Sequence, residues 1–363
     1  MKLNRDKIIE WLRCNNQDQL KLLYQQAYDV KLHEVGPKVY LRGLIELSNI
    51  CIKNCLYCGI RSSNSIPRYE LTEGEVLSAA RFAHEEGYGS IVLQSGERQD
   101  HAFIENVDRL LKGIKIATSN QLGITLSLGE QSFSTYKKWF NSGAHRYLLR
   151  IETTNQELYQ RIHPDGHDFD QRKSCLKDLK KIGYQVGTGV MIGLPWQTVD
   201  DLVNDLLYYD DQDIDMIGMG PYLPHRQSPL QGAGPVDLNR NFEWTLKMIA
   251  LSRIFLRDVN IAATTALQTI HFQGREWGIK AGANVIMPNV TPMRYRQDYQ
   301  LYDDKPCLND DASLSADCLA SSMHVLSVPI GYKEWGDAPH YHNRMKDKPF
   351  GPICTDESFH ADK

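Results

Sequence analysis

Residues 45–60 read IELSNICIKNCLYCGI, and this stretch guides the interpretation of the whole chain. An apolar, strand-like run is followed at once by three cysteines within eight residues, Cys51, Cys55 and Cys58. Structural zinc normally takes four protein ligands, and no histidine lies within 15 residues on either side. Ferredoxin clusters use four thiolates at other spacings. The spacing C-x3-C-x2-C therefore favours a 4Fe-4S cube held at three corners, with zinc as the alternative.

Composition restricts the class of protein. The chain has 363 residues, of which 42% are hydrophobic, enough for one large domain or two ordinary ones. The net charge is -4 and the basic residues are scattered, so we expect no nucleic-acid partner. The polar start of the chain and the lack of a long apolar run predict a cytoplasmic protein without membrane contact. Disulfides are rare there, so the eight cysteines indicate metal ligation and buried thiols.

Strand-like and helix-like patterns alternate along the chain and predict the fold. Short apolar runs lie at 43–48, 90–95, 122–128, 145–151, 185–192, 214–219, 260–264 and 284–287. Helical patterns between them include 73–87, 132–142, 169–182, 198–210 and 240–256. Eight strands alternating with helices predict an α/β fold, a (β/α)8 TIM-type barrel of parallel strands, with an open doubly wound sheet as the alternative.

Three regions follow from this pattern. Residues 1–40 are expected to form an N-terminal helical cap, and residues 41–303 the barrel. The regular pattern ends after residue 303, so 304–363 is predicted to be a C-terminal extension packing on the barrel. Its polar tail, DKPFGPICTDESFHADK, is expected to be poorly ordered or to cover one edge.

The cysteine motif carries a resemblance to a known superfamily. C-x3-C-x2-C after a first barrel strand, with Tyr57 before the last cysteine and Gly59 after it, is similar to the radical S-adenosylmethionine (SAM) motif. The resemblance implies that Cys51, Cys55 and Cys58 are the catalytic cluster ligands and that SAM binds the open iron. One-electron reduction would then cleave SAM to methionine and a 5'-deoxyadenosyl radical.

Further segments resemble the SAM-binding positions of that superfamily. QSGE supplies Gln94, Gly96 and Glu97, and RIE supplies Arg150 and Glu152. The resemblance implies that SAM is bound by Tyr57, Gly59, Gln94, Gly96, Glu97, Arg150, Glu152, Arg172 and Ile192, the last within GVMIGLPWQT. A structural ion pair at the rim is the alternative for Arg150, Glu152 and Arg172.

Longer segments, including GAHRYLLRIETTN and GANVIMPNVTPMRYRQDYQLY, resemble the radical SAM family of FeFe-hydrogenase maturases, HydE. Biotin synthase and methylornithine synthase share the barrel and the cysteine triplet. Biotin synthase needs strand cysteines for a second cluster, whereas the later strand-like runs here contain none and Cys175 falls in a helical pattern. A methylornithine synthase-like amino-acid mutase stays open, as does a non-catalytic iron-sulfur carrier. A carrier has no use for Glu97, Glu152 and Arg172.

Residues expected in the barrel interior predict a small, polar or anionic substrate. Thr125 and Ser127 alternate inward on the predicted third strand, and Arg146 lies on the fourth. An arginine with several hydroxyl groups can bind a carboxylate or a cyanide-like group by charge-assisted hydrogen bonds. The candidate substrate-binding residues are Thr125, Ser127, Arg146, Thr264, Thr265, Met287, Tyr299 and Tyr302. Core packing is the alternative for Met287 and the two tyrosines.

The resemblance also implies a substrate and partners. The substrate would be an organometallic Fe(CO)2(CN)-cysteine precursor made by a radical SAM tyrosine lyase, and the product would pass toward a GTPase scaffold maturase in H-cluster assembly. A ferredoxin or flavodoxin would supply the electron. Some relatives hold a second, peripheral Fe-S cluster at positions matching Cys307, Ser315 and Cys318; the serine makes a stable second cluster unexpected.

Overall fold

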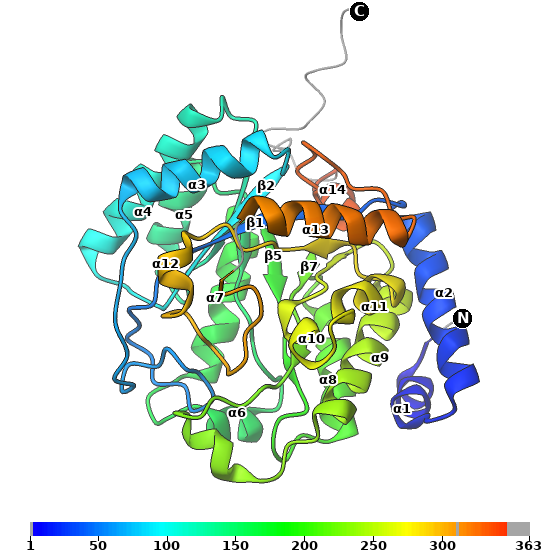
Figure 1. Cartoon of the computed structure of the whole chain (residues 1–363). Helices are drawn as coiled ribbons and strands as arrows, with labels where there is room; N and C mark the ends of the chain where they lie inside the picture. Colours follow the sequence, from blue (N-terminus) through cyan, green and yellow to red (C-terminus); the bar gives the residue numbers. More distant parts are fainter. Residues whose placement is uncertain (1–2, 310–311, 347–363) are drawn as a thin grey trace, which may run out of the picture.

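The computed structural model describes residues 3–309 and 312–346, and a barrel of parallel strands lies at its centre (Figure 1). The sheet has the order β10-β1-β2-β3-β4-β5-β7-β9. A parallel bridge between Ala262 and Val285 joins the two ends of this order, so the barrel is nearly closed. The prediction of a (β/α)8 barrel is confirmed, and the open sheet is excluded. The strands are β1 (Tyr40–Ser48), β2 (Ser90–Ser95), β3 (Gly123–Ser127), β4 (Arg146–Leu148), β5 (Gln185–Thr188), β7 (Met216–Ile217), β9 (Asn260–Ile261) and β10 (Val285–Ile286).

The predicted strand at 185–192 is divided. After β5 the chain bends at Gly189 and forms β6 (Met191–Ile192), which pairs with β8 (Gly220–Pro221) in a separate two-stranded sheet. A Cβ atom at Gly189 would lie 2.0 Å from the carbonyl oxygen of Gly218, so glycine permits this close backbone approach. The small sheet extends the barrel wall toward the mouth.

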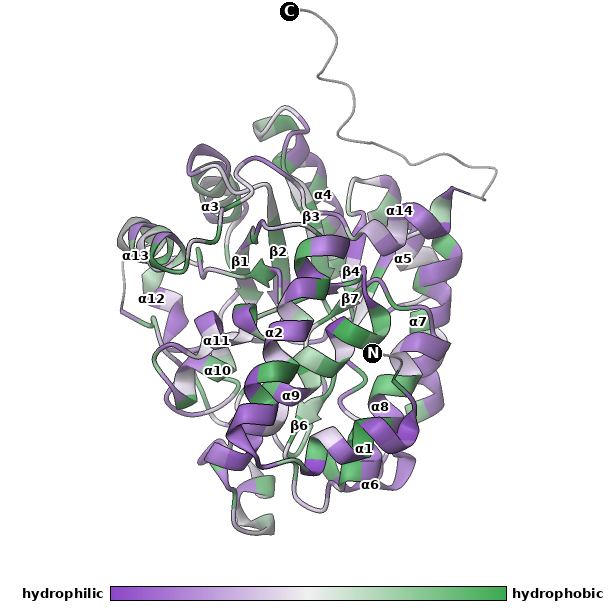
Figure 2. Ribbon diagram, turned by 90° about the vertical axis from the view of Figure 1, so that its right-hand side faces the viewer, coloured by the Kyte–Doolittle hydropathy of each residue, from purple (hydrophilic) through white to green (hydrophobic). Residues whose placement is uncertain are grey.

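Helices surround the barrel and bury its outer face. Ile91 and Leu93 of β2 and Ile124 and Leu126 of β3 are fully buried against them, whereas Val92 and Thr125 alternate toward the interior. In Figure 2 these strands are largely green, while the surrounding helices carry both green and purple. The outer helices are α3 (Glu73–Glu85), α4 (His101–Ala117), α5 (Phe133–Asn141), α6 (Gln156–Ile162), α7 (Phe169–Ile182), α8 (Val199–Asp211), α9 (Leu238–Leu256), α10 (Thr265–Ile270), α11 (Gly274–Lys280) and α12 (Met293–Arg296).

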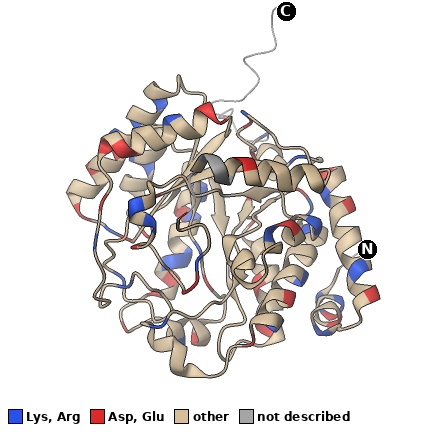
Figure 3. Ribbon diagram, in the orientation of Figure 1, with Lys and Arg blue, Asp and Glu red and all other residues tan. Residues whose placement is uncertain are grey.

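The N-terminal region consists of α1 (Arg5–Arg13) and α2 (Gln17–Glu34), which pack on α8 and α9. Both helices begin at an asparagine whose side chain accepts backbone N–H bonds, Asn4 for α1 and Asn16 for α2. Positive and negative side chains are interspersed over the helices (Figure 3). Within 3–309 and 312–346, none of the helices combines the length and apolar character that crossing a bilayer requires.

The C-terminal region forms helices that the sequence analysis did not anticipate, α13 (Ala312–Val325) and α14 (Pro339–Met345). The regular sequence pattern ends after residue 303, but helical structure continues beyond it. Just before α14, residues 335–338 close the N-terminal end of the barrel, which is the lower end by the usual convention for barrels and the upper end in Figure 1. The Arg42 guanidinium donates to the Gly336 carbonyl oxygen at 3.1 Å, and Arg146 Nε donates to Asp337 Oδ1 at 2.9 Å. The tail at 347–363 lies outside the described residues.

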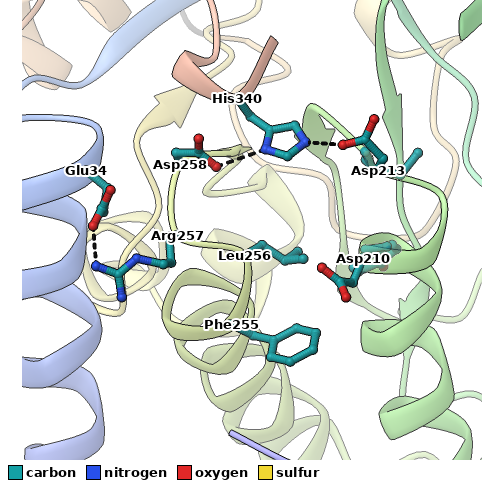
Figure 4. A pocket seen from close by; sticks show the side chains of 10 residues that line it. Glu34, Asp210, Asp213, Phe255, Leu256, Arg257, Asp258 and His340 are labelled. Carbon is teal, nitrogen blue, oxygen red and sulfur yellow. Dashed lines mark hydrogen bonds and ion pairs between the residues drawn. The ribbon is translucent and has the colours of Figure 1, made fainter. Parts of the chain in front are cut away.

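A further set of polar contacts holds α14 against the same end of the barrel (Figure 4). His340 bridges two carboxylates, with its Nδ1 2.9 Å from Asp258 Oδ1 and its Nε2 2.7 Å from Asp213 Oδ1. Its hydrogen bond to Asp258 is the largest influence and raises the pKa of His340 to about 9. These groups border a cavity of about 200 Å³. Asp213 precedes β7 and Asp258 precedes β9, so this cavity lies at the opposite end from the strand C-termini where barrel enzymes place their chemistry.

Candidate active site

A cavity of about 320 Å³ opens at the C-terminal ends of the strands. The three motif cysteines line it together with residues that follow several different strands. Of the residues predicted for cofactor and substrate, it is lined by Tyr57, Gln94, Gly96, Glu97, Ser127, Arg150, Glu152, Arg172, Thr264, Thr265, Met287, Tyr299 and Tyr302. This is the position at which a parallel barrel gathers chemistry.

Hydrogen bonds to main-chain oxygens fix the cysteine loop after β1. The guanidinium of Arg68 donates to the carbonyl oxygens of Asn49, Ile60, Arg61 and Asn64 at 2.6–2.9 Å. The Asn49 amide donates to the carbonyl oxygens of Pro67 at 2.8 Å and Asp298 at 2.7 Å. Arg68 and Asn49 therefore hold the loop in shape through its backbone oxygens. The role of Arg68 was not predicted, because no sequence motif marks a side chain that binds main-chain oxygens.

The chemistry of the three thiols suits an iron-sulfur cluster. Burial raises the pKa of Cys55 to about 12 and also raises the pKa values of Cys51 and Cys58. Thiols buried in this way are inert unless a metal replaces the proton. The Glu97 N–H already donates to Cys51 Sγ at 3.3 Å, the kind of N–H to sulfur bond that tunes bound clusters. Three ligands of this type fit a cube with one open iron.

Glu97 belongs to a four-residue charge network beside the cysteines. Lys53 Nζ lies 3.3 Å from Glu97 Oε1 and 3.0 Å from Glu130 Oε2. Arg172 Nε lies 2.8 Å from Glu130 Oε1, while its NH2 is 3.9 Å from Glu97. Burial raises the pKa of Glu97 despite these cations. Gly129, at φ +74°, permits the network because a Cβ there would lie 2.3 Å from Glu97 Cγ.

Arg150 and Glu152 form an ion pair that leaves hydrogen-bonding capacity unused. Arg150 NH2 lies 2.9 Å from Glu152 Oε2, but without hydrogen-bond geometry, and Arg150 Nε is also buried without a partner. Burial raises the pKa of Glu152. Buried polar atoms usually have partners, so these atoms provide places for the polar groups of a bound ligand. The ion pair expected at the rim therefore exists, and its unpaired hydrogen-bonding atoms suit the amino-acid and ribose groups of SAM.

The remaining wall carries hydroxyl groups. Gln94 Nε2 donates to the hydroxyl oxygen of Tyr299 at 3.2 Å. Thr264 Oγ1 is buried without a hydrogen-bond partner, and a Cβ at Gly220 would lie 2.7 Å from it. Burial raises the pKa of Tyr302. At neutral pH both tyrosines are therefore neutral hydroxyl groups.

A buried ion pair on this wall was missed. Lys305 Nζ bonds to the Glu46 carboxylate, whose other oxygen accepts from Asn289 Nδ2 at 3.1 Å. Lys305 also donates to the Tyr299 carbonyl oxygen at 3.0 Å. Both charged residues line the cavity, and Glu46 is 1% exposed. The available signal was a glutamate inside the apolar strand run GLIELS, because a charge at an inward strand position requires a partner.

Two predicted substrate residues lie deeper than the cavity. Arg146 is fully buried at the start of β4 and pairs with Asp337, which excludes it from the mouth. Four residues of extended chain separate it from Arg150, about 13 Å along the strand. Thr125 borders a small cavity of about 30 Å³ below the main one, beside Arg42. Strand alternation correctly placed Thr125 inward, but neither alternation nor the position of Arg146 on its strand indicated how deep each residue lies.

Two predicted cofactor residues also do not line the cavity. Gly59 is buried under the C-terminal segment: its N–H donates to the Leu301 carbonyl oxygen at 2.9 Å, and an added Cβ would lie 2.1 Å from the Gln300 carbonyl oxygen. Ile192 is fully buried, and its carbonyl oxygen accepts from the Tyr222 N–H at 2.8 Å. The neighbouring residue Met191 reaches the cavity instead.

Comparison with known proteins agrees with this geometry. The model of the radical SAM superfamily matches residues 45–208. The [FeFe] hydrogenase maturase subunit HydE of Thermotoga maritima is 43% identical over 92% of this chain and 93% of its own length. The 3-methylornithine synthase of Methanosarcina acetivorans is 28% identical over 78% of this chain and 79% of its own. The crystal structure of methylornithine synthase (PylB) has a TM-score of 0.78 at 24% identity and covers 92% of this chain and 95% of that one.

The barrel, the cysteine triplet and the superfamily match define a radical SAM enzyme, which uses a 4Fe-4S cluster and SAM. The 43% identity to the Thermotoga maritima protein, over nearly the full length of both chains, further places this chain in the HydE family.

Proposed function

We propose that the protein acts on an organometallic Fe(CO)2(CN)-cysteine precursor in assembly of the FeFe-hydrogenase H-cluster. The observation that carries this proposal is a single cavity lined by two sets of groups. The first set comprises the three cysteines, Glu97 and the Arg150–Glu152 pair, and the second comprises hydroxyl groups and the Glu46–Lys305 pair. The likeness to a protein described as a hydrogenase maturase supports this choice of substrate.

The residues have separable roles in this proposal. When bound, the cluster and SAM supply one-electron cleavage to methionine and a 5'-deoxyadenosyl radical. Cys51, Cys55 and Cys58 hold the cluster. The atoms of Arg150 and Glu152 that lack hydrogen-bond partners orient the polar end of SAM. The apolar part of the wall, with Leu148 and Met287, excludes water from the reacting region.

The second set of groups is suited to the precursor. Cyanide and carboxylate groups accept charge-assisted hydrogen bonds, which Lys305 is able to donate. Thr264 contributes a buried hydroxyl group without a partner, and Thr265 and Tyr302 line the same cavity. A ligand group bonded to Thr264 would satisfy a polar atom that the protein leaves unpaired.

The proposal extends to location and partners. The precursor would come from a radical SAM tyrosine lyase, the product would go to a GTPase scaffold maturase, and a ferredoxin or flavodoxin would supply electrons. We infer a cytoplasmic protein, where thiols stay reduced. A stable second cluster at Cys307 and Cys318 is not proposed, because the third matching position is Ser315.

Infrared spectroscopy tests the substrate assignment. Reduced, reconstituted protein is incubated anaerobically with SAM and a synthetic cysteine-ligated iron dicarbonyl cyanide complex, and the carbonyl and cyanide bands are followed with the adenosyl products. Loss of the starting bands with an adenosylated product is expected. Cleavage of SAM with an untouched complex would refute the proposed substrate and leave an amino-acid mutase as the candidate. Thr265→Val and Tyr302→Phe should retain SAM binding and slow the loss of the bands.

A further inference from the structure

Two histidines lie beside one cluster ligand. One coordinating atom each from Cys55, His163 and His167 come within 4.8 Å of one another. The histidines follow α6, more than 100 residues beyond the cysteine in sequence. Sequence spacing therefore did not indicate them as metal ligands. A backbone hydrogen bond from the Leu56 N–H to the Ile162 carbonyl oxygen, at 3.0 Å, holds the two segments together.

The hydrogen bonds of His163 define which of its ring nitrogens can bind a metal. Its Nδ1 lies 2.9 Å from the carbonyl oxygen of Tyr159, and a carbonyl only accepts, so Nδ1 carries the proton. In the neutral ring Nε2 then carries the lone pair, which accepts from the Tyr57 hydroxyl at 3.4 Å. Stacking on Tyr159, with ring centroids 4.0 Å apart, fixes the orientation. Such a backbone partner on the other nitrogen is typical of metal-binding histidines.

His167 supplies an independent observation. It stacks on His163 with ring centroids 5.1 Å apart, and its buried Nδ1 has no hydrogen-bond partner. A buried nitrogen without a partner is costly unless a ligand satisfies it. Thiolate and imidazole are the ligands that Zn²⁺ prefers.

We propose that in the cluster-free protein Cys55, His163 and His167 bind a soft divalent cation such as Zn²⁺, and that this site competes with cluster assembly. Coordination replaces the Cys55 thiol proton, which passes to solvent, and solvent takes the fourth position. Around tetrahedral zinc, ligand atoms lie about 3.5 Å apart, so side-chain movements of about 1 Å complete the site. Cys55 serves either the cation or the cluster, so the two states exclude each other.

Cobalt provides the probe for the site. The cluster-free, reduced protein is titrated anaerobically with Co²⁺, whose visible spectrum reports tetrahedral geometry and thiolate ligation, and Zn²⁺ is used to displace it. The variant with Cys51→Ser and Cys58→Ser should lose the 4Fe-4S cluster but retain one-thiolate Co²⁺ binding. Loss of Co²⁺ binding in this variant would overturn the proposal, because the cation would then be held by the cysteine triplet.

Histidine variants test the other ligands. His167→Ala, and His163→Phe with its stacked ring retained, should weaken Zn²⁺ binding at least about 100-fold, since loss of an outer-shell partner alone costs about 10- to 100-fold. His33→Ala, at an 81% exposed side chain, is the control and should bind as the unaltered protein does. Circular dichroism and melting temperature confirm folding of each variant. Unchanged Zn²⁺ affinity in the folded histidine variants would overturn the site.

Competition is measured separately during cluster reconstitution. Equimolar Zn²⁺ should lower the iron and sulfide content of the reconstituted protein, and His167→Ala should restore it. Equal cluster content with and without Zn²⁺ in the unaltered protein would refute the competition. Failure of the infrared experiment would not affect this result, because neither SAM nor a substrate is present.

Discussion

Replacing His340 should lower the free energy of unfolding of the protein by an amount that depends on pH. His340 lies between Asp213 and Asp258 and connects α14 to the lower end of the barrel (Figure 4). Arg344, on the same helix, forms an ion pair with Asp215. The two carboxylates favour the imidazolium and raise the pKa of His340 from 6.5 to about 9. The folded state therefore binds this proton more tightly than the unfolded state does.

The sign and the magnitude follow from proton linkage. A group with a raised folded-state pKa contributes its full stabilisation below the unfolded pKa of 6.5, and loses it as pH rises to about 9. Each pKa unit corresponds to about 1.4 kcal/mol, so the contribution is about 3 kcal/mol at most. The His340 side chain is 25% exposed, and solvent screening reduces this value.

Urea unfolding at pH 6 and pH 9.5 measures the effect. His340→Gln should be less stable than the unaltered protein at pH 6, and the difference should shrink by up to about 3 kcal/mol at pH 9.5. His342→Gln, at an exposed position on the same helix, serves as the control and should follow the pH dependence of the unaltered protein. A stability difference for His340→Gln that is equal at both pH values would refute the reasoning.

Three further changes test the active site. Cys58→Ser should lose most cluster iron and abolish SAM cleavage; an iron assay and product chromatography check this, and retention of both would contradict the role of the triplet. Gly59→Ala should lower the free energy of unfolding by about 1–3 kcal/mol, because its Cβ would lie 2.1 Å from a carbonyl oxygen. Gly74→Ala, where nothing lies within 4 Å of the added Cβ, is the control and should not lower the melting temperature. Lys305→Met should lower the free energy of unfolding by about 3–5 kcal/mol, because it leaves the Glu46 carboxylate unpaired. Adding Glu46→Gln should recover much of this loss, as measured by urea unfolding. No recovery would refute the role of Lys305 as the partner of Glu46.

Local pattern was sufficient for the barrel but not for the depth of its residues. Short apolar runs identified the strands, and alternation set Thr125 inward, because side chains on a strand change face at every residue. Which inward residue reaches the mouth depends on where each strand begins and on what closes its lower end. Asp337 pairs with Arg146 across 191 residues, a partner that no periodicity indicates.

The limits at the active site have the same cause. The cysteine triplet and QSGE are each contiguous in sequence, so spacing indicated the cluster ligands and a resemblance to the radical SAM superfamily indicated the SAM-binding role of QSGE. The Glu46–Lys305 pair spans 259 residues, and the position of Lys305 follows from chain packing. The helix α13, within ASLSADCLASSMHV, has weak amphipathic character and escaped prediction for the complementary reason: small residues do not mark a buried face.

The two ends of the barrel are both completed by late parts of the chain. At the mouth, the Leu301 carbonyl oxygen accepts from Gly59 and Lys305 pairs with Glu46, so residues after β10 hold both the cysteine loop and β1. At the lower end, Asp337 neutralises Arg146 inside the barrel. A buried cation without its carboxylate is unstable, so the lower interior requires the segment before α14. The cysteine motif is thus local in sequence, whereas the cavity that makes it useful depends on residues about 240 positions later in the chain.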